Sequence, residues 1–350
     1  MEAPGNIEAA GGCGEAPSIG ITIGDPAGIG PEIVAKALVR PEVRQWCRCV
    51  VYGQQAAFDR IAGVVAQMPL LKVVQSVQEA FYVSPDVVPL VEVRAAFPPD
   101  VPIGSVSMAG GRAAFAYIRA AVQDALAGHL DGMVTAPIHK EALRAAGVPF
   151  IGHTEMLAHL AGCSAAFTMF MAGSLRIFFV TRHVSLRRAC DLITTQRVLD
   201  TILAADRYLR RLGLSDPLLA VAALNPHASD GGLMGDEEAH TIMPAVDAAR
   251  ERGVRVTGPV PADSVFHQAI QGRFDAVISL YHDQGHIAAK VYDFDRTVSL
   301  TLGLPFLRTS VDHGTALDIA GTGKAREISM LEAIRVAARY ARPWRATAGR

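Results

Sequence analysis

The chain has 350 residues, 50% of them hydrophobic, and its 33 basic and 34 acidic residues leave a formal net charge of −1. A near-neutral chain has no strong field that would draw it to nucleic acid or to an anionic membrane surface. No apolar run is long enough to span a membrane. The composition therefore indicates a soluble globular protein with a full core, large enough for two lobes.

The five cysteines are odd in number and lack the CxxC spacing of a thiolate zinc site. This pattern also argues against a disulfide framework and favours the reducing cytoplasm. Residues 1–17 do not have the pattern of a signal peptide, and we expect them to form a disordered tail. Regular structure should begin near Ser18.

From Ser18 onward, short apolar runs alternate with helical patterns. Strands are expected at residues 18–23, 50–53 and 132–137, and helices at 31–38, 110–127, 195–212 and 237–252. Proline at position 31 suits the first turn of a helix. Strands that alternate with helices of this length predict an α/β protein with a mainly parallel sheet and right-handed crossovers.

Three apolar runs end in histidine: residues 176–183 end in His183, 218–227 in His227 and 274–282 in His282. Ligand crevices of α/β sheets lie beyond the carboxyl ends of the strands, so these imidazoles should converge. Three imidazoles with Asp283 nearby suit a borderline divalent metal such as zinc. The alternative is that each histidine only caps a strand through a backbone hydrogen bond.

The glycine-rich segment 24–30 stands between a strand and a helix but does not match a dinucleotide-binding fingerprint. That fingerprint requires G-x-G-x-x-G, whereas the glycines here are Gly24, Gly28 and Gly30, with Pro26 between them. The segment is either a tight turn or a loop that contacts a ligand.

Two further groups suggest an anion-binding site. His153 and Thr154 precede an apolar helical stretch, where backbone amides hold anions well, although Thr154 could be only a helix cap and Glu155 a first-turn carboxylate. A cationic set follows in Lys290, Arg296 and Arg308. A forked guanidinium suits phosphate or carboxylate, although such an arginine more often closes a surface salt bridge.

Several long motifs, in order, carry a resemblance that covers residues 18–341. They are GDPAGIGPE at 24–32, TAPIHK at 135–140, GHTE at 152–155, NPHA at 225–228, YHDQG at 281–285 and RTSVDHGTA at 308–316. The chain resembles the 4-hydroxythreonine-4-phosphate dehydrogenase family. The resemblance implies a two-lobed α/β fold similar to isocitrate and isopropylmalate dehydrogenases, with mainly parallel sheets and a central cleft.

The expected lobes are a cofactor-side lobe of residues 18–130 plus 296–345, and a lobe for substrate, metal and dimerisation at 131–295. The resemblance also implies a homodimer whose subunits share the active site. It makes His183, His227 and His282 the ligands of one divalent metal, which would be zinc, magnesium or cobalt.

By the same resemblance, His153, Thr154, Lys290 and Arg308 are substrate-binding residues. Ser299 occupies the place of an asparagine in the family pattern V-N-I-T, so a water fills the gap or the ligand differs there. Lys290 and Asp283 are the candidate catalytic residues, with Lys290 transferring a proton or acting as a clamp for phosphate or carboxylate.

Residues 312–324 are similar to the loop with which isopropylmalate dehydrogenases hold the adenosine of NAD. The candidate cofactor-binding residues for NAD or NADP are His313, Gly314, Thr315 and Asp318. The alternative is a glycine-rich turn with a capping aspartate.

The implied activity is metal-dependent oxidation of 4-phosphooxy-L-threonine at its 3-hydroxyl, followed by decarboxylation to 3-amino-2-oxopropyl phosphate, in pyridoxal phosphate biosynthesis. The alternative within the family is a dehydrogenase of 4-phospho-D-threonate or 4-phospho-D-erythronate in sugar-acid catabolism. The alternative of a different class is a non-catalytic zinc-binding module. A structural zinc normally has four protein ligands, whereas three histidines leave one metal position open, which argues against this alternative.

Overall fold

The structure is a computed structural model that describes residues 16–95, 97–163 and 166–347. Nearly all of the tail expected at residues 1–17, together with Cys13, lies outside this range. Strands and helices alternate over most of the described chain, as the periodicity predicts, but the strands at 167–172 and 175–179, and those at 298–302 and 307–311, follow each other directly.

One twelve-stranded sheet runs through the whole protein, in the order β3-β4-β2-β1-β5-β12-β11-β6-β7-β10-β8-β9. Its strands are β1 (Ser18–Thr22), β2 (Arg48–Gly53), β3 (Leu71–Val74), β4 (Val88–Glu92), β5 (Gly132–Thr135), β6 (Phe167–Ala172), β7 (Leu175–Phe179), β8 (Leu219–Ala222), β9 (Val256–Val260), β10 (Ala276–Ser279), β11 (Val298–Leu302) and β12 (Leu307–Val311). The pairs β12–β11, β11–β6 and β6–β7 are antiparallel, and the others are parallel. The predicted mainly parallel sheet is confirmed, with an antiparallel centre.

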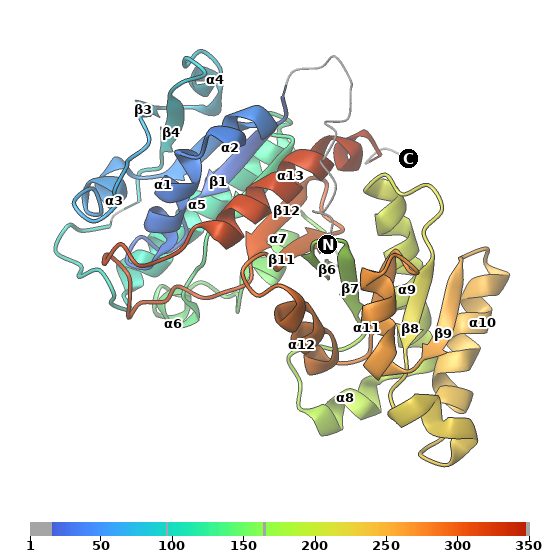
Figure 1. Cartoon of the computed structure of the whole chain (residues 1–350). Helices are drawn as coiled ribbons and strands as arrows, with labels where there is room; N and C mark the ends of the chain where they lie inside the picture. The colour runs from blue at the N-terminus through green and yellow to red at the C-terminus, as the bar shows by residue number, and fades with distance from the viewer. Residues whose placement is uncertain (1–15, 96, 164–165, 348–350) are drawn as a thin grey trace.

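Helices pack against both halves of this sheet, on either side of its antiparallel centre (Figure 1). They are α1 (Gly30–Leu38), α2 (Pro41–Trp46), α3 (Gln55–Asp59), α4 (Val77–Ala80), α5 (Met108–Leu126), α6 (Lys140–Ala145), α7 (His153–Leu160), α8 (Leu186–Leu192), α9 (Thr195–Arg211), α10 (Met243–Glu251), α11 (Ala262–Ile270), α12 (His282–Tyr292) and α13 (Ile328–Ala346). The side chains of Ser107 and Thr194 cap α5 and α9 by accepting a backbone N–H, because a hydroxyl there satisfies one of the free amides of a first turn.

The helix expected at residues 237–252 begins differently. Glu238–Ile242 forms a π-helical turn, and α10 begins only at Met243. Pro244 lacks the N–H that would bond to the carbonyl of residue 240 in a regular α-helix, so the helix widens before it.

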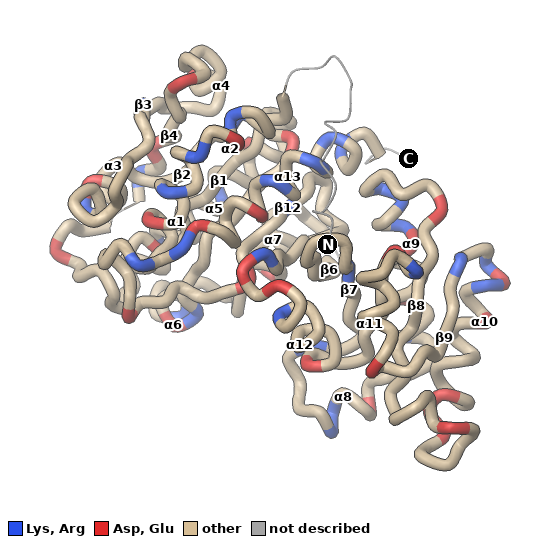
Figure 2. The backbone as a smooth tube through the Cα atoms, in the orientation of Figure 1, with Lys and Arg blue, Asp and Glu red and all other residues tan. Residues whose placement is uncertain are grey.

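The two ends of the sheet carry separate sets of helices. In Figure 1, α1, α5 and α13 lie against β1 and β12, whereas α9, α10 and α11 lie against β7 to β9. α12 lies at the junction, where it contacts β6, β7 and β10. Acidic and basic residues are interspersed over both halves (Figure 2), in keeping with the near-zero net charge. None of the described helices is both long and apolar enough to cross a membrane.

Candidate active site

Three neighbouring parallel strands, β7, β10 and β8, end at the same edge of the sheet. Phe179 of β7 is paired with Ser279 of β10, and Ile278 of β10 with Val221 of β8. His183, His282 and His227 each follow the end of one of these strands, which is the placement that the apolar runs predict.

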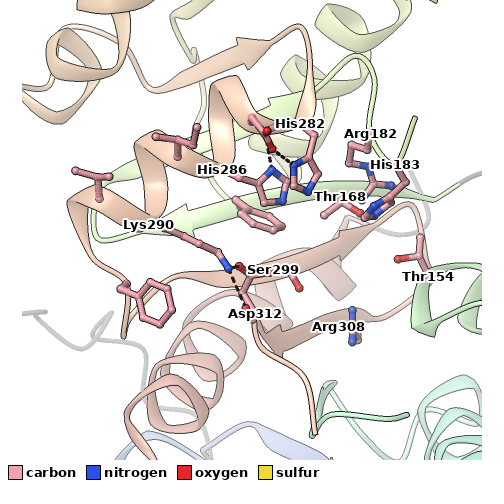
Figure 3. A pocket seen from close by; sticks show the side chains of 15 residues that line it. Thr154, Thr168, Arg182, His183, His282, His286, Lys290, Ser299, Arg308 and Asp312 are labelled. Atoms are coloured by element: carbon pink, nitrogen blue, oxygen red, sulfur yellow. Dashed lines mark hydrogen bonds and ion pairs between the residues drawn. The ribbon is translucent and has the colours of Figure 1, made fainter. Parts of the chain in front are cut away.

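A cavity of about 620 Å³ lies where β6, β11 and β12 meet the ends of β7 and β10, with α12 as one wall (Figure 3). Its lining consists of Thr154, Thr168, Phe170, Arg182, His183, His282, Asp283, His286, Ile287, Lys290, Val291, Phe294, Ser299, Arg308 and Asp312. The cavity thus collects most of the predicted substrate, metal and catalytic residues. His153 and His227 are not among the residues that line it.

Two of the three predicted metal ligands meet in this cavity. The rings of His183 and His282 are 5.6 Å apart between centroids. Burial lowers the pKa of His183, and the positive charge of Arg182 adds to this effect. His227 lines neither this cavity nor the neighbouring one that His183 and His282 share. Within the described residues of one chain, no group of three His, Cys, Asp or Glu side chains is placed to hold a metal ion.

The position of His227 has a local cause. His227 to Gly231 all have positive φ angles, and His227 is exposed. The buried carboxylate of Glu238 fixes the base of this loop, because it accepts hydrogen bonds from the backbone amides of Leu224 and Asn225 and from the Ser229 hydroxyl. These bonds are charge-assisted and satisfy the carboxylate, so His227 is held on a well-anchored, outward-facing loop.

His282 has two neighbours on its own helix. Its Nδ1 lies 2.6 Å from Oδ1 of Asp283, a contact that orients an imidazole for ligation. The ring of His286 stacks on it, with 3.7 Å between centroids. Burial lowers the pKa of His286 to about 4. His286 was not predicted to belong to the site, although its spacing of four residues from His282 on a helix places both on one face.

Lys290 reaches across the cavity from α12. Its Nζ lies 2.9 Å from Oδ2 of Asp312, which follows β12. Burial raises the pKa of Asp312, and the nearby lysine opposes that shift.

Arg308 is a buried cation at the floor of the cavity. It is 4% exposed, and its guanidinium donates to the hydroxyl groups of Thr135 and Thr301 rather than to a carboxylate. Burial lowers its pKa to about 9. It forms no salt bridge within the described residues, so the surface-salt-bridge alternative is wrong.

His153 and Thr154 begin α7 beside the cavity. The N-cap is Gly152, with no side-chain cap hydrogen bond, so Thr154 is not the helix cap. Nε2 of His153 is buried without a hydrogen-bond partner, and burial together with the charge of Arg308 lowers the pKa of this imidazole. Arg296, the third cation of the predicted set, instead pairs with Asp293 on the surface.

A smaller cavity of about 200 Å³ adjoins the first. His313 and Gly314 line it, and Asp312 and Phe294 belong to both cavities. Thr315 is buried, and its carbonyl accepts a 3.0 Å hydrogen bond from the Ile29 amide. Asp318 is exposed and lines neither cavity. The glycine-rich segment 24–30 is thus a tight turn beneath the candidate cofactor loop, and its Ile29 lines the smaller cavity.

Comparison with known proteins shows the family. Residues 45–337 match the family of the pyridoxal phosphate biosynthetic protein PdxA. The chain belongs to this family. A curated relative from Symbiobacterium thermophilum, named "Putative D-threonate 4-phosphate dehydrogenase", is 53% identical over 95% of this chain and 98% of its own length.

Solved structures confirm the fold of the PdxA family. The 4-hydroxythreonine-4-phosphate dehydrogenase from Klebsiella pneumoniae superposes with a TM-score of 0.86 at 42% identity, over 93% of this chain and all of its own. A terephthalate 1,2-cis-dihydrodiol dehydrogenase from Burkholderia xenovorans is more distant, with a TM-score of 0.63 at 31% identity, over 93% of this chain and 98% of its own. Membership of a dehydrogenase family makes this chain an oxidoreductase.

Two further residues line the main cavity. Ser299, at the position where the resemblance implies an asparagine, lines the main cavity from β11. Arg182 lines the same cavity and was not predicted to belong to the site. The available signal was its place directly before His183 at the end of an apolar run.

Proposed function

We propose that this chain uses NAD or NADP and a divalent metal to oxidise a small phosphorylated hydroxy acid, with 4-phospho-D-threonate as the substrate. Arg308 is the observation that carries the proposal. A buried guanidinium without a carboxylate partner is costly unless a ligand supplies the missing negative charge. It lies in the same cavity as His183 and His282, so an anionic substrate would be held next to the candidate metal ligands.

Two observations support a hydroxy acid over an amino acid. Asp283 and Asp312, the carboxylates that line the cavity, are already engaged with His282 and Lys290. A substrate ammonium group would have to share one of these carboxylates with its present partner, whereas a hydroxyl group needs no carboxylate. The 53% identity to a relative named for D-threonate 4-phosphate points the same way.

The second candidate substrate is 4-phosphooxy-L-threonine, whose oxidation and decarboxylation would give 3-amino-2-oxopropyl phosphate in pyridoxal phosphate synthesis. The name of the matched family and the name of the solved structure at 42% identity favour it. 4-Phospho-D-erythronate is a third substrate to be compared.

The donor groups fit a divalent metal in part. His183 and His282 bring two imidazoles together, and the lowered pKa of His183 keeps it neutral, as ligation requires. We assign the third ligand to His227 of a second copy of the chain, because this histidine lies on an exposed loop and Leu233 beside that loop is 82% exposed. Zinc, magnesium or cobalt bound there would stabilise negative charge that develops on the substrate oxygen.

The protein groups have distinct roles in the proposed reaction. Arg308 fixes the substrate carboxylate, and Asp283 orients His282. Lys290, held by Asp312, accepts the proton of the reacting hydroxyl, and a nicotinamide held by the candidate loop would supply the hydride acceptor. The product is a β-keto acid, and breaking its bond to the carboxyl carbon releases carbon dioxide. Lys290 then returns a proton to the carbon left behind, which for 4-phospho-D-threonate gives dihydroxyacetone phosphate.

The cofactor is proposed to lie in the smaller cavity. His313, Gly314 and Thr315 form its candidate binding loop, with Asp318 at the exposed end. Asp312 and Phe294 line both cavities, so a cofactor held partly in the smaller cavity would lie next to the substrate cavity.

The test is reduction of NAD and of NADP by purified protein with each divalent metal, given the three phosphorylated acids in parallel. Turnover that prefers 4-phospho-D-threonate supports the proposal, and preference for 4-phosphooxy-L-threonine supports the second candidate. A His227→Ala variant is the control. If zinc removal unfolds the protein and no acid is oxidised, the non-catalytic zinc-binding module is the better description.

A further inference from the structure

Arg182 is a cation of the active-site cavity that the proposed reaction does not yet use. It follows β7, directly before His183, and lines the main cavity as well as two neighbouring cavities of about 290 and 390 Å³. Burial lowers its pKa. No hydrogen bond or salt bridge joins its guanidinium to another residue in the part of the chain that the structure describes. The guanidinium therefore lines the cavity without a hydrogen-bond partner among the described residues, and the nearby negative charge of Glu155 acts on it.

Two threonines line the same cavity as Arg182. The hydroxyl of Thr168, a residue 9% exposed, is buried without a hydrogen-bond partner. Thr154 lies in the first turn of α7, whose N-cap makes no side-chain hydrogen bond. Figure 3 shows Thr154, Thr168 and Arg182 on the same side of the cavity, with Arg308 below them. This side thus combines a guanidinium, two hydroxyls and helix N-terminal amides.

We propose that Arg182 binds the phosphate of the substrate, together with Thr154 and Thr168, and that it thereby selects phosphorylated acids. The inference rests on the proposed function and extends it by assigning the two anionic ends of the substrate. Phosphate presents several acceptor oxygens and suits a forked guanidinium and the first turn of a helix. Arg182 has its whole fork available for it.

Arg308 suits the other end of the substrate. Its Nε and Nη2 already donate to Thr135 and its Nη1 to Thr301. Few donors remain, which is enough for a carboxylate but poor for a phosphate. Arg182 therefore binds the phosphate of the substrate and Arg308 binds its carboxylate.

The first arm of the test measures phosphate binding without turnover. The rise in melting temperature with inorganic phosphate is recorded for wild-type protein, Arg182→Ala, Arg182→Lys and the control Arg187→Ala. Arg187 is an exposed arginine of α8 that lines none of these cavities. We expect the rise in wild type and Arg187→Ala, a smaller rise in Arg182→Lys and none in Arg182→Ala. An equal rise in all four proteins, or none in wild type, overturns the proposal.

The second arm compares kcat/KM for 4-phospho-D-threonate and for unphosphorylated D-threonate. In Arg182→Ala we expect a loss of roughly 100-fold for the phosphorylated acid and little change for the other, because only the first presents a phosphate. Equal losses for both acids would show that Arg182 only positions His183, and would overturn the proposal. If no acid is oxidised by wild type, the proposed function fails while the first arm still decides the role of Arg182.

Discussion

Lys290 Nζ lies 2.9 Å from Oδ2 of Asp312, and this ion pair joins α12 to the segment that follows β12. Lys290 Nζ also donates a hydrogen bond of 3.4 Å to the backbone carbonyl of Asp312. Asp312 also lines the smaller cavity that His313 and Gly314 form. The pair therefore lies where the proposed substrate and cofactor cavities meet.

Replacement of Lys290 should remove proton transfer without removing cofactor binding. For Lys290→Met we expect kcat to fall by roughly 100-fold or more, the usual range for a lost general acid–base group, with the KM for NAD unchanged. Steady-state kinetics with each substrate measure both values. Lys72→Met, an exposed change on β3, is the control. If instead the KM for the acid rises while kcat stays unchanged, Lys290 acts as a clamp for the phosphate or carboxylate of the substrate.

Arg308→Met should abolish activity without lowering the stability of the protein. The substitution removes a buried, unpaired charge, and apolar replacement of buried charges is often neutral or stabilising. We expect the free energy of unfolding, measured with urea, not to fall. Oxidation of phosphorylated and unphosphorylated acids should be lost to the same degree, because both carry the carboxylate. Loss restricted to the phosphorylated acid would place the phosphate at Arg308 and contradict the assignment.

His227 and His183 should complement each other between subunits. His227→Ala and His183→Ala should each be inactive as pure proteins. If His227 serves the site of a second copy, co-expression of the two variants gives hybrid dimers with one intact site, and about a quarter of wild-type activity should return. Purification with two different affinity tags isolates the hybrid. An inactive hybrid would mean that both histidines act from the same chain.

Much of the fold could be predicted from local pattern. The parallel strands and their histidine-bearing ends follow from short apolar runs, and the expected helix at 195–212 is observed as α9, Thr195–Arg211. The antiparallel centre of the sheet could not be read in the same way. Neither an alternating pattern of apolar residues nor a buried apolar run indicates whether a strand is parallel or antiparallel to its neighbour. That direction depends on pairing between distant segments, such as that of Ser299 with Phe170.

Fewer features of the site than of the fold could be predicted from the sequence. Three strand ends predicted that His183, His227 and His282 converge, but the loop of His227 is set by Glu238, eleven residues away. Arg182 and His286 were not assigned because an arginine or a histidine next to a predicted ligand has many possible roles. Only the cavity shows which of them face the same space.

Gly28→Ala should weaken cofactor binding, because Gly28 packs against Thr315 of the candidate cofactor loop. A Cβ at Gly28 would lie 2.9 Å from Cβ of Thr315 and 3.1 Å from its carbonyl oxygen, so the loop must shift. We expect a several-fold higher KM for NAD with a smaller effect on the KM for the acid. Gly63→Ala is the matched control, since a Cβ there meets no atom within 4 Å. An unchanged KM for NAD would place the cofactor away from Thr315.

The stability of the protein should depend on pH through His286. Its pKa is lowered to about 4 in the folded state, chiefly by burial, whereas an imidazole in an unfolded chain titrates near 6.5. The unfolded state therefore binds more protons between these values, so the free energy of unfolding falls as pH drops from about 6.5 towards 4. His286→Gln removes this proton uptake.

Urea unfolding of metal-free protein at about pH 7 and about pH 5 measures the effect. The loss of stability between the two pH values should be smaller in His286→Gln than in wild type, while the exposed control His240→Gln should behave as wild type. Equal losses in all three proteins would mean that His286 is not desolvated by Phe170 and Phe179, whose rings lie 4.2 and 4.6 Å from it between centroids. The packing of α12 on β6 and β7 would then be looser than the structure shows.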